Sequence, residues 1–176
     1  MGKKTKLALA IAAASAAAWA GSKAISKPQK RESKPALQFE RPIVIARRGG
    51  AKLAPEHSLI AFEKSAELGV DGFSVCVRLT KDEEIIAFHD ATVDRTTNGS
   101  GFVKDLTLAE LQELNSGYNF VCLDGEHAYR TEVVSVVTLK ELLEIFEDKL
   151  FFINIEDGPD TYEGSLMPSK LWRLIE

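Results

Sequence analysis

The sequence predicts an α/β fold with a parallel sheet, on three observations. Apolar runs of strand length alternate with segments of helical periodicity between residues 42 and 155. Residues 70–79 alternate between two faces, as a strand does. Two Thr-x-x-Glu capping boxes, beginning at Thr107 and Thr138, each precede an apolar-periodic segment. Strands that alternate with helices favour a parallel sheet, because each parallel pair needs a crossover connection.

The strands and the first helix follow from local pattern. Residues 42–46 form an apolar run ahead of a glycine-rich loop, which predicts a buried strand, and residues 58–68 carry helical periodicity closed by Gly69. Residues 84–88 and 150–155 predict two further strands. In the strand at 70–79, one face carries Val75, Val77 and Leu79, and the other carries Ser74, Cys76 and Arg78.

Charge is distributed unevenly along the 176 residues. Residues 1–36 carry eight Lys and Arg against one acid, a net charge of +7, and the remainder carries 14 basic and 25 acidic residues, a net charge of −11. Nucleic-acid binding depends on basic groups that neutralise phosphates, so this acidic remainder excludes a nucleic-acid partner.

The basic start and the uncharged residues 7–21 predict a signal peptide or a membrane anchor at residues 1–22. Ala18-Trp19-Ala20 fits a cleavage site, and an alanine-rich soluble helix is the alternative. Residues 23–40, with two prolines, predict a linker, and residues 41–176 the folded domain. We therefore expect an exported protein of a bacterial cell envelope, either secreted or held at the membrane by this segment.

Three segments together carry a family resemblance. The first runs from Ile45-Ala46-Arg47-Arg48-Gly49-Gly50 to Ala54-Pro55-Glu56-His57-Ser58, the second is Gly69-Val70-Asp71-Gly72-Phe73-Ser74-Val75-Cys76-Val77, and the third joins Phe88-His89-Asp90 to Val93-Asp94-Arg95-Thr96-Thr97-Asn98-Gly99. A weaker fourth segment is Ile153-Asn154-Ile155-Glu156. In this order they resemble the front half of the glycerophosphodiester phosphodiesterase family.

The resemblance implies a (β/α)8 TIM barrel with its site at the carboxyl ends of the strands. Such barrels take about 250 residues, which is far more than the chain offers after its linker. We therefore expect roughly the first half of a barrel, as in a fragment or a truncated product. Open sheet edges in such a half barrel favour self-association.

The family hydrolyses glycerophosphodiesters to glycerol 3-phosphate and an alcohol. The resemblance implies a divalent cation, Mg²⁺ or Ca²⁺, held by acidic side chains, and two histidines that act as acid and base. His89 matches the second histidine, whereas Arg47 stands at the first. Arginine stays protonated and cannot be a base. Arg48 matches the family's arginine and is a candidate for phosphate binding, and Glu56 matches a nearby acid.

The metal positions depart further from the family. Ser74 and Cys76 stand where the family has a Glu-x-Asp pair, and neither is a good ligand for a hard cation. Glu156 matches the third ligand, and Gly158 replaces a lysine. The sequence therefore predicts an impaired or inactive phosphodiesterase and no assured metal site.

Three alternatives remain at this stage. His89 with an unusual cation site that includes Glu156 is compatible with residual hydrolysis. Arg47 and Arg48 are compatible with non-catalytic binding of glycerol phosphate or another anion, or with simple neutralisation of neighbouring acids. Cys76, His89 and Glu156 are compatible with a softer metal site, although no sequence spacing supports one; Cys76 is more simply a small, semi-buried residue.

Overall fold

The computed structural model describes residues 39–176, and Pro42–Glu176 form one compact unit. Its sheet has four strands: β1 (Ile45–Arg47), β2 (Gly72–Leu79), β3 (Ile85–Ala87) and β4 (Leu150–Ile155). Strand β4 has the bounds that its apolar run predicts. Strand β1 is shorter than predicted and ends one residue later, so that Arg47 belongs to the strand.

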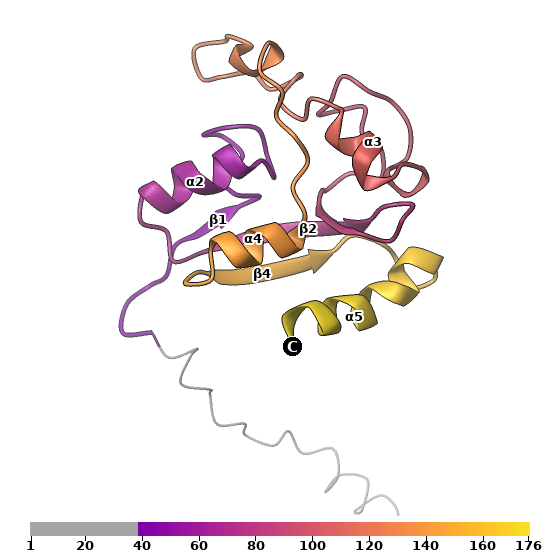
Figure 1. Cartoon of the computed structure of the whole chain (residues 1–176). Helices are drawn as coiled ribbons and strands as arrows, with labels where there is room; N and C mark the ends of the chain where they lie inside the picture. The colour runs from indigo at the N-terminus through magenta and orange to yellow at the C-terminus, as the bar shows by residue number, and fades with distance from the viewer. Residues whose placement is uncertain (1–38) are drawn as a thin grey trace, which may run out of the picture. The chain divides into compact units, whose positions relative to one another are not determined.

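Strand β2 is the centre of the sheet (Figure 1). Strands β1 and β4 pair with it in parallel, which confirms the predicted parallel sheet. Strand β3 is the exception, because it pairs with the second half of β2 in an antiparallel direction. Both β4 and β1 pair with Gly72, and both β4 and β3 pair with Val77, so β1 and β3 share one edge of β2 and β4 occupies the other.

Four α-helices complete the unit: α2 (Leu59–Glu67), α3 (Leu108–Gln112), α4 (Leu139–Ile145) and α5 (Tyr162–Ile175). Two 3-10 turns lie at Val103–Asp105 and Ala128–Arg130. Both predicted capping boxes are present: the hydroxyl of Thr107 accepts from the amide of Glu110, and Thr138 and Glu141 repeat the arrangement. Each box satisfies amides that the first turn leaves without a partner.

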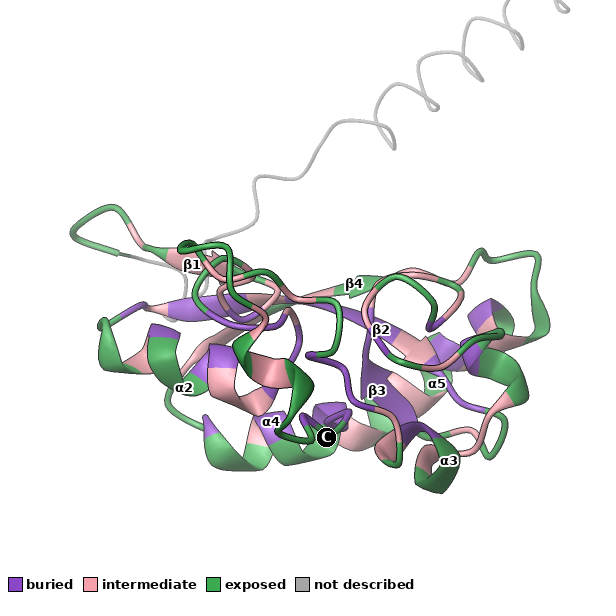
Figure 2. Ribbon diagram, turned by 90° about the horizontal axis from the view of Figure 1, so that it is seen from above, coloured by how far each residue is buried: buried purple, intermediate pink, exposed green. Residues whose placement is uncertain are grey.

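The main core lies between one face of the sheet and three helices. Phe73, Val75 and Val77 of β2 are fully buried in one cluster with residues of α2, α4 and α5, namely Phe62, Leu139, Leu142 and Met167. Figure 2 shows α2 and α4 on the same side of the sheet, with β2 and β3 largely buried. The alternation of β2 therefore separates an apolar, helix-covered face from a polar face, as the sequence predicts.

The polar face positions the candidate site. In the register of the sheet, Arg47 of β1 lies opposite Ser74, and Cys76 lies opposite Asn154 of β4. Side chains opposite one another in paired strands point to the same side of the sheet. Glu156 directly follows β4 and continues this face.

The predicted signal or anchor at residues 1–22 and most of the linker at 23–40 lie outside the described residues. Within residues 39–176, no helix is long and apolar enough to cross a bilayer. Also within this range, no strand pairs with the outer edge of β4 or of β1. Self-association through these edges stays a prediction.

Candidate functional site

The predicted site residues converge at the carboxyl ends of the parallel strands. Arg47 ends β1, Cys76 lies in β2 and Glu156 follows β4. His89 follows β3, which runs antiparallel to β2 and therefore ends beside Cys76. The amide of Phe88 donates to the carbonyl of Cys76 over 2.9 Å. Ligand atoms of Cys76, His89 and Glu156 lie within 4.8 Å of one another.

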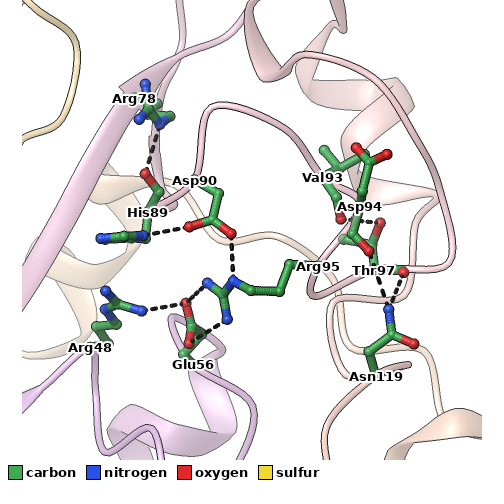
Figure 3. Close-up of polar contacts among 10 residues, drawn as sticks. All are labelled: Arg48, Glu56, Arg78, His89, Asp90, Val93, Asp94, Arg95, Thr97 and Asn119. Atoms are coloured by element: carbon green, nitrogen blue, oxygen red, sulfur yellow. Dashed lines mark hydrogen bonds and ion pairs between the residues drawn. The ribbon is translucent and has the colours of Figure 1, made fainter.

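The side chain of His89 is held by a carboxylate, which an arginine binds in turn (Figure 3). Its Nδ1 lies 2.5 Å from Oδ1 of Asp90, and Nε of Arg95 donates to the other oxygen of Asp90. The hydrogen bond from Arg95 lowers the pKa of Asp90 to about 2, so Asp90 is a carboxylate under ordinary conditions. An ionised Asp90 accepts a hydrogen bond from the N–H group at Nδ1, which leaves Nε2 of His89 as the free ring nitrogen.

Glu56 is bound by two arginines. Nη1 of Arg48 donates to Oε1 of Glu56 over 3.0 Å, and Arg95 donates to both oxygens, over 2.6 and 3.2 Å. Burial alone would raise the pKa of Glu56, but Arg95 and Arg48 outweigh it and hold the pKa below its usual value. The structure thus shows Arg48 neutralising an acid, one of the two roles that the sequence allows it.

Arg78 of β2 links His89 to Asp157, which lies just after β4. Its Nε donates to the carbonyl of His89 over 2.8 Å, and its Nη1 forms an ion pair with Asp157. An arginine in the middle of an apolar strand is the sequence feature that hints at this role, because buried charge requires a partner. Asp157 gives no such hint, since its partner is 79 residues away.

His57 is the least expected member of the site. It lies in the loop before α2, but its side chain is buried, and Nε2 accepts a hydrogen bond from the backbone amide of Cys76 over 3.1 Å. Its φ of 59° is a left-handed conformation that asparagine adopts more readily. Burial lowers the pKa of His57 from 6.5 to about 3, so it is neutral in the folded protein.

His57 makes a specific pH dependence of stability expected. Because its pKa is lowered in the folded state, the unfolded chain binds the extra proton, and stability is lost as the pH falls from 6.5 toward about 3. Between pH 7 and pH 5 this amounts to about 2 kcal/mol of unfolding free energy. Urea denaturation at the two pH values measures it, and His57→Asn should remove most of the difference. An equal pH dependence in both proteins would contradict the assignment to His57.

Ser74 and Cys76 present no negative oxygen to a metal. The amide of Asn154 donates to Oγ of Ser74 over 3.0 Å, which occupies that hydroxyl. Burial, together with a hydrogen bond to Glu156, raises the pKa of Cys76 to about 12 and keeps the free thiol protonated. Mg²⁺ and Ca²⁺ require several hard oxygen ligands. This donor set, with Glu156 as its one carboxylate, does not fit either ion.

Arg47 differs from its neighbour in having no acidic partner. Its side chain is exposed, and within residues 39–176 it forms no ion pair. Arg48 carries one buried atom, Nε, that lacks a hydrogen-bond partner in the described part of the chain. The two arginines therefore retain unused donors at the end of β1.

A model of the glycerophosphoryl diester phosphodiesterase family matches residues 48–164. This match covers more than half of the chain and includes every predicted site residue except Arg47. The chain belongs to this family. A glycerophosphodiester phosphodiesterase of Caldanaerobacter subterraneus subsp. tengcongensis is 46% identical over 114 residues, covering 65% of this chain and 44% of the relative. One of Bacillus subtilis is 36% identical over 129 residues, covering 73% and 44%.

Solved phosphodiesterase structures show the same fold. The glycerophosphoryl diester phosphodiesterase domain of a Mycobacterium tuberculosis protein superposes with a TM-score of 0.67 at 26% identity, over 76% of this chain and 49% of that one. An Agrobacterium tumefaciens glycerophosphodiester phosphodiesterase gives 0.65 at 25%, over 77% and 52%. The TIM-barrel-like α/β fold implied by the resemblance is thereby confirmed for the folded unit. The chain spans about half the length of the relatives it matches.

Proposed function

We propose that this chain is a glycerophosphodiester phosphodiesterase homologue whose metal-dependent hydrolysis is impaired. The observation that carries the proposal is the donor set on β2, where a hydroxyl and a protonated thiol occupy the positions of two carboxylates in the family pattern. Glu56 does not replace them, because Arg48 and Arg95 already bind its oxygens. With Glu156 as the one carboxylate of this donor set, a hard dication has too little binding energy to stay near the phosphodiester.

The loss of a base adds to the loss of the metal. Arg47 stands at the position of the family's first histidine and stays protonated at any working pH. Removal of a general base typically costs about 10²–10⁴ in rate. His89, oriented by Asp90, is the remaining candidate for proton transfer. One acid or base without its partner and without a cation does not support turnover at the level of the family.

A hydrolysis assay tests this proposal. Glycerophosphodiesters are incubated with the protein and Mg²⁺ or Ca²⁺, and the release of glycerol 3-phosphate is measured with and without chelator. We expect no release above the level of a His89→Ala variant. Turnover that both chelation and His89→Ala abolish would show that the site is an active phosphodiesterase.

A second candidate function is non-catalytic binding of glycerol phosphate or a similar anion. The exposed Arg47, which forms no ion pair within residues 39–176, favours it, because guanidinium groups bind phosphate oxygens through paired N–H donors. Isothermal titration calorimetry with glycerol 3-phosphate should show saturable binding that Arg47→Gln weakens. Lys52→Gln provides a control for general loss of positive charge. Absence of heat at millimolar ligand would reject this candidate.

We also propose that residues 1–22 direct the protein to the cell envelope, either as a cleaved signal or as an anchor. The basic start followed by an uncharged, alanine-rich run supports this. Cell fractionation of the whole chain and of a form that begins at residue 23 tests it. Identical distributions of the two forms would contradict it.

A further inference from the structure

Three different ligand types meet where the family pattern places a hard-cation site. Cys76 comes from the middle of β2, His89 from the segment after β3 and Glu156 from the end of β4. One sulfur, one ring nitrogen and one carboxylate oxygen lie within 4.8 Å of one another. Local spacing in the sequence gives no indication of this group, because 67 residues separate its last two members.

We propose that Cys76, His89 and Glu156 bind a divalent transition metal ion of the zinc class. Zinc prefers sulfur and imidazole nitrogen together with a carboxylate oxygen, and three protein ligands leave its fourth position open. The same donor set discriminates against Mg²⁺ and Ca²⁺, which demand oxygen ligands. The substitution of the family's acid by Cys76 therefore changes the kind of metal that the site accepts.

The distances are compatible with one tetrahedral ion. Zinc–ligand bonds of about 2.0–2.3 Å place neighbouring ligand atoms about 3.3–3.8 Å apart. The observed group, with a limit of 4.8 Å, has to contract by about 1 Å at its widest separation. Glu156 and His89 are both partly exposed, so their side chains have room for the small adjustments that this contraction requires.

The surroundings of His89 resemble those of a metal ligand. Zinc-bound histidines typically donate their second ring N–H to a carboxylate, which fixes the orientation of the ring. Asp90 supplies that carboxylate at Nδ1, and Arg95 in turn holds Asp90. In Figure 3 the second ring nitrogen lies on the side of the ring away from Asp90, and this nitrogen, Nε2, is the proposed donor.

Three of the four arginines around the proposed ligands are already paired with acids, and Arg47 is the cation that works against a dication there. Glu56 neutralises Arg48, Glu56 and Asp90 both bind Arg95, and Asp157 pairs with Arg78. On binding, the thiol of Cys76 releases its proton to the buffer, as coordinated thiols do. The resulting thiolate and the carboxylate of Glu156 balance the two charges of the ion, so the ion and its three ligands together carry no net charge.

Metal titration of the purified, tag-free and reduced chain tests the proposal. Calorimetry with Zn²⁺ should show one ion per chain, and Co²⁺ should give the absorption of a tetrahedral centre with a thiolate-to-cobalt charge-transfer band. Cys76→Ser should remove the band and weaken Zn²⁺ binding by at least about 10–100-fold, and Asp90→Asn should weaken it about 10–100-fold because Asp90 orients the His89 ring.

Cys122 provides the matched control, because it is the other free cysteine. Cys122→Ser should keep the charge-transfer band and the stoichiometry of one, which assigns the band to Cys76 even if Cys76→Ser fails to fold. Lack of saturable Zn²⁺ binding, or a band that disappears in Cys122→Ser, would overturn the proposal. So would unchanged affinity in a folded Cys76→Ser protein. None of these readouts depends on hydrolysis, so this proposal and the impaired-hydrolase proposal succeed or fail separately.

Discussion

The triple variant Arg47→His, Ser74→Glu and Cys76→Asp is expected to gain Mg²⁺- or Ca²⁺-dependent hydrolysis of glycerophosphodiesters. It supplies the two carboxylates that a hard cation needs and a histidine that titrates near neutrality. We expect a rate at least about 10²-fold above that of the natural chain, since a general base alone typically contributes about 10²–10⁴. The gain is measured as release of glycerol 3-phosphate by the protein that the longest reading frame containing this sequence encodes.

Two controls separate the contributions within this variant. Arg47→His alone should stay inactive, because it adds a base without a metal. Ser74→Glu with Cys76→Asp should bind the cation without full activity, because Arg47 remains. Gly158 stands at the family's lysine, and a side chain there would meet open space, so Gly158→Lys is a compatible addition. If the triple variant binds cation but does not hydrolyse substrate, the decisive losses lie elsewhere.

Phe73→Ala is expected to lower the free energy of unfolding by about 3–5 kcal/mol, the usual cost of removing a phenylalanine from a core. Phe73 is fully buried, and its ring centroid lies 4.9, 5.1 and 5.7 Å from those of Phe62, Phe146 and Phe151. These rings join α2 and β4 to β2 and approach Phe73 edge-on or tilted. Urea denaturation measures the change.

Phe152→Ala is the matched control for this prediction. Phe152 lies one residue away from Phe151 on the opposite face of β4, and its side chain is 48% exposed. Its truncation should cost within about 0.5 kcal/mol, as surface substitutions usually do. Equal losses in the two variants would contradict the assignment of the core to the helix-covered face.

Local patterns predicted the elements that local interactions determine. The capping boxes at Thr107 and Thr138 predicted two helix starts, because cap and third residue contact each other within one turn. The sequence did not predict that β3 runs antiparallel to β2, since this pairing depends on the tight turn after Leu79. Helix α5 was not predicted, because Pro168 lies within it and Met167 is its one large side chain that is fully buried. Three leucines of the helix are only partly buried against the core, namely Leu166, Leu171 and Leu174.

The site was predictable in its members but not in its contacts. Family motifs identified His89, Cys76 and Glu156, whereas their proximity depends on the sheet register and on the hairpin between β2 and β3. The burial of His57 and the binding of Glu56 by Arg95 were equally invisible, because partners 19 and 39 residues away define them. The sequence identifies the chemical type of each candidate donor, whereas the contacts of that donor depend on the fold.

Calorimetric titration of the natural chain with Ca²⁺ and Mg²⁺ tests most directly the claim that β2 has lost its hard-cation site. We expect no saturable heat for either ion, whereas Ser74→Glu with Cys76→Asp should bind Ca²⁺ with a dissociation constant of about 10⁻⁴–10⁻³ M, as weak carboxylate sites do. Submillimolar binding of either ion by the natural chain, lost in Glu156→Gln, would contradict the account.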